Sequence, residues 1–373
     1  MNPPIPAYDT FFLPAPHWLL ITLATFTFWV HLILVGAVAG STVFLIARRF
    51  RRRSDLDRAI DSRILHALPV CLSFTITFGV APLLFIQVLY GHYFYAANVF
   101  LGGYWLLALA FVFIAFVSLY FAHRCRRSFA AAGILLLASL GFLGVMYIFT
   151  NNAVLSIAPE HWLAFHRNLA ALHVPDAITI PRFLHNFGAT FVLGGLAVAW
   201  IGRFRPRTDP NDLQTRRIAA TRAGLRFTFL GLLLQIALGL WFLLSLPSDV
   251  LKGLISFHSV TSFAWWTAVA LVGLNLWTVV KGLLAPHRLK WLLLSTFIPL
   301  TGLVGMLLAR QYLRSAYLGR DLAGSFDLAD WSEQTQASPI LLFFVLLLLG
   351  LLLIAAMIGV TLRRQRGGTE IVL

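Results

Sequence analysis

The stretch PRFLHNFGATFVLGG, residues 181–195, decides how this chain folds. It belongs to an apolar run that continues to about residue 202, with Arg182 near its start. His185 lies inside the run, and Gly188 and Ala189 follow about one helical turn later. An apolar run of about 20 residues is long enough to cross a bilayer as an α-helix. The stretch therefore predicts a membrane-spanning helix that carries a histidine near one end.

Apolar runs of similar length recur along the whole chain. Of the 373 residues, 59% are hydrophobic and only 12% are charged, against about 25% charged residues in a typical soluble domain. The sequence predicts an all-α integral membrane protein, a single membrane domain over residues 1–373 without internal repeats. Nine transmembrane helices are expected, at residues 18–47, 63–90, 102–122, 128–150, 181–202, 222–246, 259–281, 291–312 and 338–362.

Basic clusters follow alternate spans, and they predict the orientation of the chain. Of the 29 Lys and Arg residues, 23 fall on the side that these clusters define. Short cytoplasmic loops are enriched in Lys and Arg, so the N-terminus is expected outside and the C-terminus in the cytoplasm. The net charge of +15 then reflects membrane topology, and no nucleic-acid-binding signature is present. The six remaining basic residues are Arg167, Arg182, Lys252, Arg310, Arg314 and Arg320.

Acidic residues are missing from the interior of the expected spans. All 14 Asp and Glu residues lie outside the spans or at their edges. Because proton-coupled transporters usually carry an intramembrane carboxylate, this distribution disfavours that class. The sequence also has no HExxH, Walker or serine-protease motif, and Cys71 and Cys125 form no CxxC pair.

Two histidines are expected at the same depth in the membrane. His31 precedes Arg48 by 17 positions and His185 precedes Arg203 by 18, which places each roughly 26 Å from the cytoplasmic boundary at about 1.5 Å per residue. Neutral imidazole is an axial ligand of heme iron, and helical bundles project such ligands inward. A heme also needs small neighbouring residues, for which the candidates are Gly188 and Ala189 beside His185 and Gly36, Ala37 and Gly40 after His31.

The other histidines are interpreted more simply. A histidine near a helix end commonly lies at the membrane interface or hydrogen-bonds to a neighbouring carbonyl, and this reading applies to His17, His92, His161, His166 and His173. Three more lie among basic residues at the cytoplasmic edge and are expected to be solvated: His66, His123 and His287.

Several segments, in order, resemble subunit I of cytochrome bd-type quinol oxidases. They are FWVHLILVGAVAGSTVFLIA (28–47), FGVAPLLFIQVLYGHYF (78–94), SLGFLGVMYIFTNNAV (139–154), PRFLHNFGATFVLGG (181–195) and LARQYL (308–313). The resemblance implies a bundle of nine spans with the orientation argued above. It also implies that His31 serves a high-spin heme and that His185 binds a low-spin heme b.

The chain also departs from that family. The third span, GYWLLALAFVFIAFVSLYF (103–121), and the eighth, WLLLSTFIPLTGLVGMLLARQ (291–311), lack the family's glutamates. Near SFHSVTS (256–262) the family's methionine ligand is absent, and His258 is the expected replacement opposite His185. The family's long quinol-binding loop is reduced to about LPSDVLKGLISF (246–257). The usual quinol site is therefore expected to be absent.

The resulting expectation is a heme b-binding electron-transfer subunit of a respiratory complex in a bacterial cytoplasmic membrane. His185, His31 and His258 are the expected ligands of heme iron, with Gly188 in the heme-binding site. The expected partners are further membrane subunits and, on the outer side, a c-type cytochrome. That partner would dock near the acid-rich segment 313–337. Two alternatives remain open: a heme-free anchor that kept the fold, and a divergent terminal oxidase that uses a heme bound by His31.

Overall fold

The computed structural model describes residues 12–50, 54–125, 128–203, 210–321 and 333–366. These residues form helices and no sheet, with one isolated bridge between Leu13 and Glu333. Residues 322–332 of the acid-rich segment 313–337 that we expected to dock a partner lie outside the described residues.

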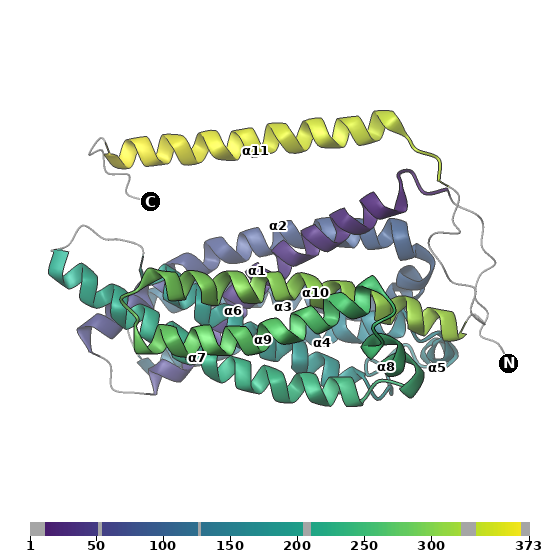
Figure 1. Cartoon of the computed structure of the whole chain (residues 1–373), viewed down its shortest axis with the longest axis horizontal. Helices are drawn as coiled ribbons and strands as arrows, with labels where there is room; N and C mark the ends of the chain where they lie inside the picture. The colour runs from purple at the N-terminus through teal and green to yellow at the C-terminus, as the bar shows by residue number, and fades with distance from the viewer. Residues whose placement is uncertain (1–11, 51–53, 126–127, 204–209, 322–332, 367–373) are drawn as a thin grey trace. The chain divides into compact units, whose positions relative to one another are not determined.

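In the part of the chain that the structure describes, nine long helices follow the nine expected spans (Figure 1). They are α1 (His17–Arg49), α2 (Asp55–Phe100), α3 (Gly102–Arg124), α4 (Ser128–Leu155), α6 (Thr179–Ile201), α7 (Pro210–Leu244), α9 (Val260–Leu284), α10 (Leu289–Asp321) and α11 (Ala337–Arg366). Three short helices lie between them: the 3-10 helix η1 (Pro159–His161), α5 (Trp162–Arg167) and α8 (Ser248–Ile255).

Eight of the long helices are long and apolar enough to cross a membrane, namely α1 to α4, α6, α7, α9 and α10. The prediction of a multi-pass α-helical membrane protein is therefore confirmed. The ninth expected span, 338–362, lies on α11, whose described apolar part is the shorter segment Ala337–Gly350. The count of nine spans stays a prediction.

Large apolar side chains face outward along the long helices, as a lipid environment requires. On α3, for example, Leu106, Leu109 and Phe113 are each at least 66% exposed. A soluble protein rarely exposes contiguous apolar surface of this kind. The exposed apolar side chains therefore agree with the hydropathy of the helices in indicating a bilayer as the surrounding solvent.

Helix α2 begins at a built N-cap and is interrupted near its far end. The Ser54 hydroxyl accepts a hydrogen bond from the Asp57 backbone, and the Asp57 carboxylate accepts one from Ser54, which completes a capping box. At Tyr90 the backbone leaves helical geometry, with φ −138° and ψ 27°. The expected end of the second span, at residue 90, therefore coincides with a break inside a longer helix.

Glycines allow the backbone of α6 to contact the backbones of α1 and α7. A Cβ on Gly40 of α1 would lie 1.8 Å from the Thr190 carbonyl oxygen on α6. On the α7 side, a Cβ on Gly224 would lie 2.4 Å from the Gly195 carbonyl oxygen. Small residues are common where membrane helices pack, because their backbones must come close to gain van der Waals contact. Helix α6 is thus held between α1 and α7 by contacts that a side chain would prevent.

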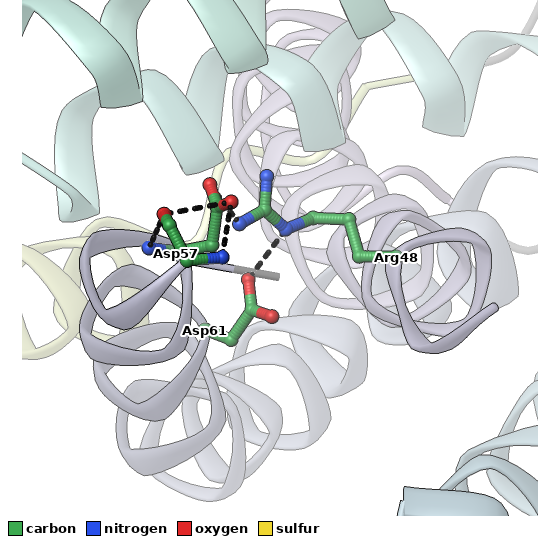
Figure 2. Close-up of polar contacts among 4 residues, drawn as sticks. Arg48, Asp57 and Asp61 are labelled. Atoms are coloured by element: carbon green, nitrogen blue, oxygen red, sulfur yellow. Dashed lines mark hydrogen bonds and ion pairs between the residues drawn. The ribbon is translucent and has the colours of Figure 1, made fainter. Parts of the chain in front are cut away.

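A buried ion pair joins the C-terminal end of α1 to the start of α2 (Figure 2). The Arg48 guanidinium lies 2.7 Å from one carboxylate oxygen of Asp61 and 2.7 Å from one of Asp57. Asp61 is only 2% exposed, whereas the Asp57 side chain is 33% exposed. The network lies at the end of the helices that the basic clusters predict to be cytoplasmic.

By its contacts, the chain divides into two units, of which the first comprises most of the bundle, from Ile21 to Asp327. The second combines residues 8–20 and 328–373 and therefore includes α11. Within this second unit, Glu333 accepts hydrogen bonds from the backbone N–H of His17 at 2.9 Å and from its Nδ1 at 2.7 Å. Both hydrogen bonds favour the charged carboxylate and so lower the pKa of Glu333, and the bond from the backbone N–H has the larger effect. The carboxylate also satisfies a free N–H at the start of α1.

Candidate functional site

His31 lies on α1 with one ring nitrogen already committed to α2. Its Nδ1 is 3.0 Å from the backbone carbonyl oxygen of Thr75. Because a carbonyl only accepts, Nδ1 carries the proton and Nε2 carries the lone pair. Among the described residues, Nε2 has no hydrogen-bond partner of its own. This arrangement, with one nitrogen fixed by a carbonyl and the other left available, is the one that metal-ligating histidines use.

A glycine on α2 makes the position of His31 possible. A Cβ on Gly79 would lie 2.8 Å from Cε1 and 3.0 Å from Nδ1 of the His31 ring. Phe28, one turn earlier on α1, stacks on the same ring with a centroid distance of 6.2 Å. The imidazole is therefore seated between Gly79 and Phe28, and any side chain at position 79 would displace it.

His185 on α6 faces α7 instead. Its ring packs against Gly239, where a Cβ would lie 3.1 Å from Cε1, and against the ring of Phe242 at 5.9 Å. The amide nitrogen of Gln235 lies 3.0 Å from Nε2 and 3.2 Å from Nδ1. Since an amide N–H donates, the lone pair of His185 is already used by Gln235. His185 is therefore less available as a ligand than His31.

The small residues near the two histidines make room for other helices. A Cβ on Gly188 would lie 2.7 Å from Oε1 of Gln235, so this glycine admits the Gln235 side chain. A Cβ on Gly36 would lie 2.5 Å from the side chain of Leu193, so Gly36, like Gly40, lies at the contact of α1 with α6. The space that these glycines leave is filled by protein side chains and backbone.

His258 lies apart from the contacts of His185. It is exposed in the turn that joins α8 to α9, whereas the ring contacts given above for His185 come from α7. Among the described residues, the structure shows no contact between His258 and either His31 or His185. Two axial ligands of one iron lie on opposite faces of the heme and need not contact each other, so the opposition of His185 and His258 stays a prediction.

Three arginines converge at the opposite end of the bundle from Arg48. The Arg310 guanidinium lies 4.7 Å from the ring centroid of Phe28, and that of Arg314 lies 4.2 Å from the ring of Tyr90. Arg182, at the start of α6, is close enough to interact electrostatically with both. Arg314 is only 7% exposed and also donates to Gln311 Oε1 at 3.2 Å.

A partly open cleft lies between α1, α2 and α10 beside these arginines. Arg310, Arg314, Gln311 and Thr25 form its polar part, and its other walls are apolar: Ala24, Phe28, Pro82, Ile86, Leu89 and Leu307. Sequence reasoning missed this cluster. The available signal was that three of the six basic residues on the predicted outer side, Arg182, Arg310 and Arg314, fall within or beside apolar spans.

The connection between α4 and α6 contributes to two other groups of polar residues that lie close together. Glu160, His161 and Asp176 bring one ligand atom each within 4.8 Å of one another, between α4 and α6. His173, in the same connection, pairs with the Tyr147 hydroxyl at 3.0 Å. His17 and His173 thus each form a hydrogen bond, but their partners are a carboxylate and a hydroxyl and not the expected neighbouring carbonyl.

No family model matches this chain, and no curated protein matches it in sequence. What fold and composition establish is the class, a multi-pass α-helical membrane protein.

Proposed function

We propose that this chain is a heme b-binding electron-transfer subunit of a respiratory membrane complex. It would exchange electrons with an outer-side partner such as a c-type cytochrome, without the usual quinol site. The observation that carries the proposal is His31, with Nδ1 held by the Thr75 carbonyl and Nε2 without a partner among the described residues. A heme supplies one-electron redox chemistry when it is bound, and neutral imidazole is one of its usual axial ligands.

The surroundings of His31 fit this role. Phe28 on α1 stacks on the His31 ring, and Gly79 on α2 leaves room for that ring. Ligand and cofactor sites in helical bundles are built in this way, from side chains on facing helices. In the proposal His31 is the first ligand and Thr75 fixes its tautomer. His185 is the second candidate, available when Gln235 moves off its ring.

The test is the heme content of the purified complex, measured as pyridine hemochrome and as a reduced-minus-oxidised spectrum. We expect His31→Ala to lose heme and its α-band. Gly79→Ala should alter the position of the ring, and with it the spectrum or midpoint potential, because its Cβ would overlap the imidazole. His166→Ala, an exposed histidine on α5, is the matched control and should keep full heme content.

Each other outcome has a defined meaning. A colourless wild-type complex would overturn the proposal in favour of a heme-free anchor. Full heme in His31→Ala together with loss in His185→Ala would transfer the ligand role to His185. Oxygen uptake by the purified complex with a chemical reductant would identify a terminal oxidase instead of an electron-transfer subunit.

A further inference from the structure

The arginine cluster presents an excess of positive charge inside the predicted membrane domain. Arg310 and Arg314 face rings and an amide, and among the residues that the structure describes neither forms an ion pair with a carboxylate. Among the described carboxylates, that of Asp176 interacts electrostatically with Arg182. Burial of an unpaired cation is costly, and charges in spans are kept where they pair or bind. We therefore expect an anion to bind at the arginine cluster.

The depth of the cluster indicates where that anion comes from. Arg310 follows the first residue of α10, Leu289, by 21 positions, or about 32 Å of helix. This length matches the roughly 30 Å of the hydrocarbon core. The guanidiniums then lie at the level of the phospholipid headgroups of the opposite leaflet, where phosphate is the most abundant anion.

The site has a charged part and an apolar part, and a single amphiphilic molecule could occupy both. Arg310 and Arg314 offer N–H donors that match the oxygens of a phosphate. The remaining walls, formed by residues such as Ile86, Leu89 and Leu307, are apolar and suit an acyl chain. A free phosphate would leave this apolar surface unfilled.

We propose that Arg310 and Arg314, with Arg182 beside them, bind the phosphate of an anionic phospholipid whose acyl chain occupies the cleft between α1, α2 and α10. The inference does not rest on the proposed redox function, since it concerns only the charge and shape of this cleft. Bound lipid would supply the counter-charge that the described side chains lack and would hold α10 against α1 and α2.

Native mass spectrometry of the protein, purified in mild detergent, tests the proposal by counting retained phospholipids. We expect the wild type to retain an anionic phospholipid and the double variant Arg310→Gln/Arg314→Gln to lose it. Arg167→Gln, which removes an exposed positive charge on α5, is the matched control and should retain the lipid. Equal retention in the wild type and the double variant would overturn the proposal.

A second variant guards against misfolding of the double variant. In Leu307→Trp the larger side chain occupies the apolar part of the cleft and leaves both arginines in place. Loss of the lipid in this variant, with unchanged helicity, supports the same site. In phosphatidylcholine vesicles, added phosphatidylglycerol should raise the thermal stability of the wild type but not of Leu307→Trp.

An equal rise in thermal stability with inorganic phosphate alone would assign the site to the free ion. Loss of heme without loss of lipid in the double variant would assign the arginines to heme carboxylates. Either result would overturn the lipid proposal.

Discussion

At the scale of single residues, the structure separates two histidines that the sequence treats alike. His31 and His185 lie at matching distances from the basic boundary, and each is followed by small residues. In the fold, the Nδ1 of His31 is bound to a carbonyl and its Nε2 lacks a partner among the described residues, whereas the Gln235 amide occupies the lone pair of His185. Spacing along one helix does not reveal this difference, because each partner comes from a different helix.

Replacing the buried carboxylate of Asp61 by an amide should lower the stability of the protein. Asp61→Asn removes the buried charge opposite Arg48, and breaking a buried ion pair costs about 3–5 kcal/mol. We expect a clear fall in the thermal unfolding temperature of the protein in detergent. Asp57→Asn is the comparison, because Asp57 is more exposed and an exposed pair contributes about 1 kcal/mol or less. Equal shifts for the two variants would contradict this account of the network.

At the scale of helices, glycines decide which pairs pack closely. On α6 and α7, the positions Gly195, Gly224 and Gly231 meet backbone atoms of the facing helix within 3 Å of a built Cβ. Backbone atoms cannot move aside as a flexible side chain does. Gly36 and Gly40, which the sequence suggests as space for a heme, likewise lie at a contact between helices, that of α1 with α6.

Gly224→Ala tests this packing. The new Cβ would lie 2.4 Å from the Gly195 carbonyl oxygen, and overpacking of this kind costs about 1–3 kcal/mol. Gly273→Ala on α9, where nothing lies within 4 Å, should instead be neutral or stabilise by up to about 1 kcal/mol of helix propensity. Thermal unfolding of both variants in one detergent makes the comparison. A stabilised Gly224→Ala would show that α6 and α7 are not in backbone contact.

The sequence predicts the long helices well and the connections poorly. Spans follow from hydropathy, a local property, so the expected ranges fall within α1 to α4, α6, α7 and α9 to α11 apart from one or two residues at some ends. The short helices α5 and α8 and the extension of α2 beyond Tyr90 were not predicted, because side-chain contacts hold them. In α8, for example, Val250 and Leu254 are buried.

At the scale of the whole molecule, the charge asymmetry predicts that the connection between α4 and α6 faces outward and that the one between α9 and α10 faces the cytoplasm. In a background with Cys71 and Cys125 replaced by serine, we expect a membrane-impermeant maleimide to label Leu169→Cys in intact cells. His287→Cys should react only after the membrane is permeabilised. Both positions are exposed, so access alone decides labelling. The reverse pattern would invert the orientation.

The sequence by itself determines that this is a multi-pass helical membrane protein, because length and hydropathy of each segment suffice for that conclusion. It also selects His31 and His185 as unusual polar residues in apolar helices. Only the tertiary structure decides that His31 has an available nitrogen, that the Gln235 amide occupies the lone pair of His185, and that Arg182, Arg310 and Arg314 form one cluster. The reason is physical: burial, hydrogen bonding and charge at each of these residues depend on neighbours from other helices, whose approach is set by packing.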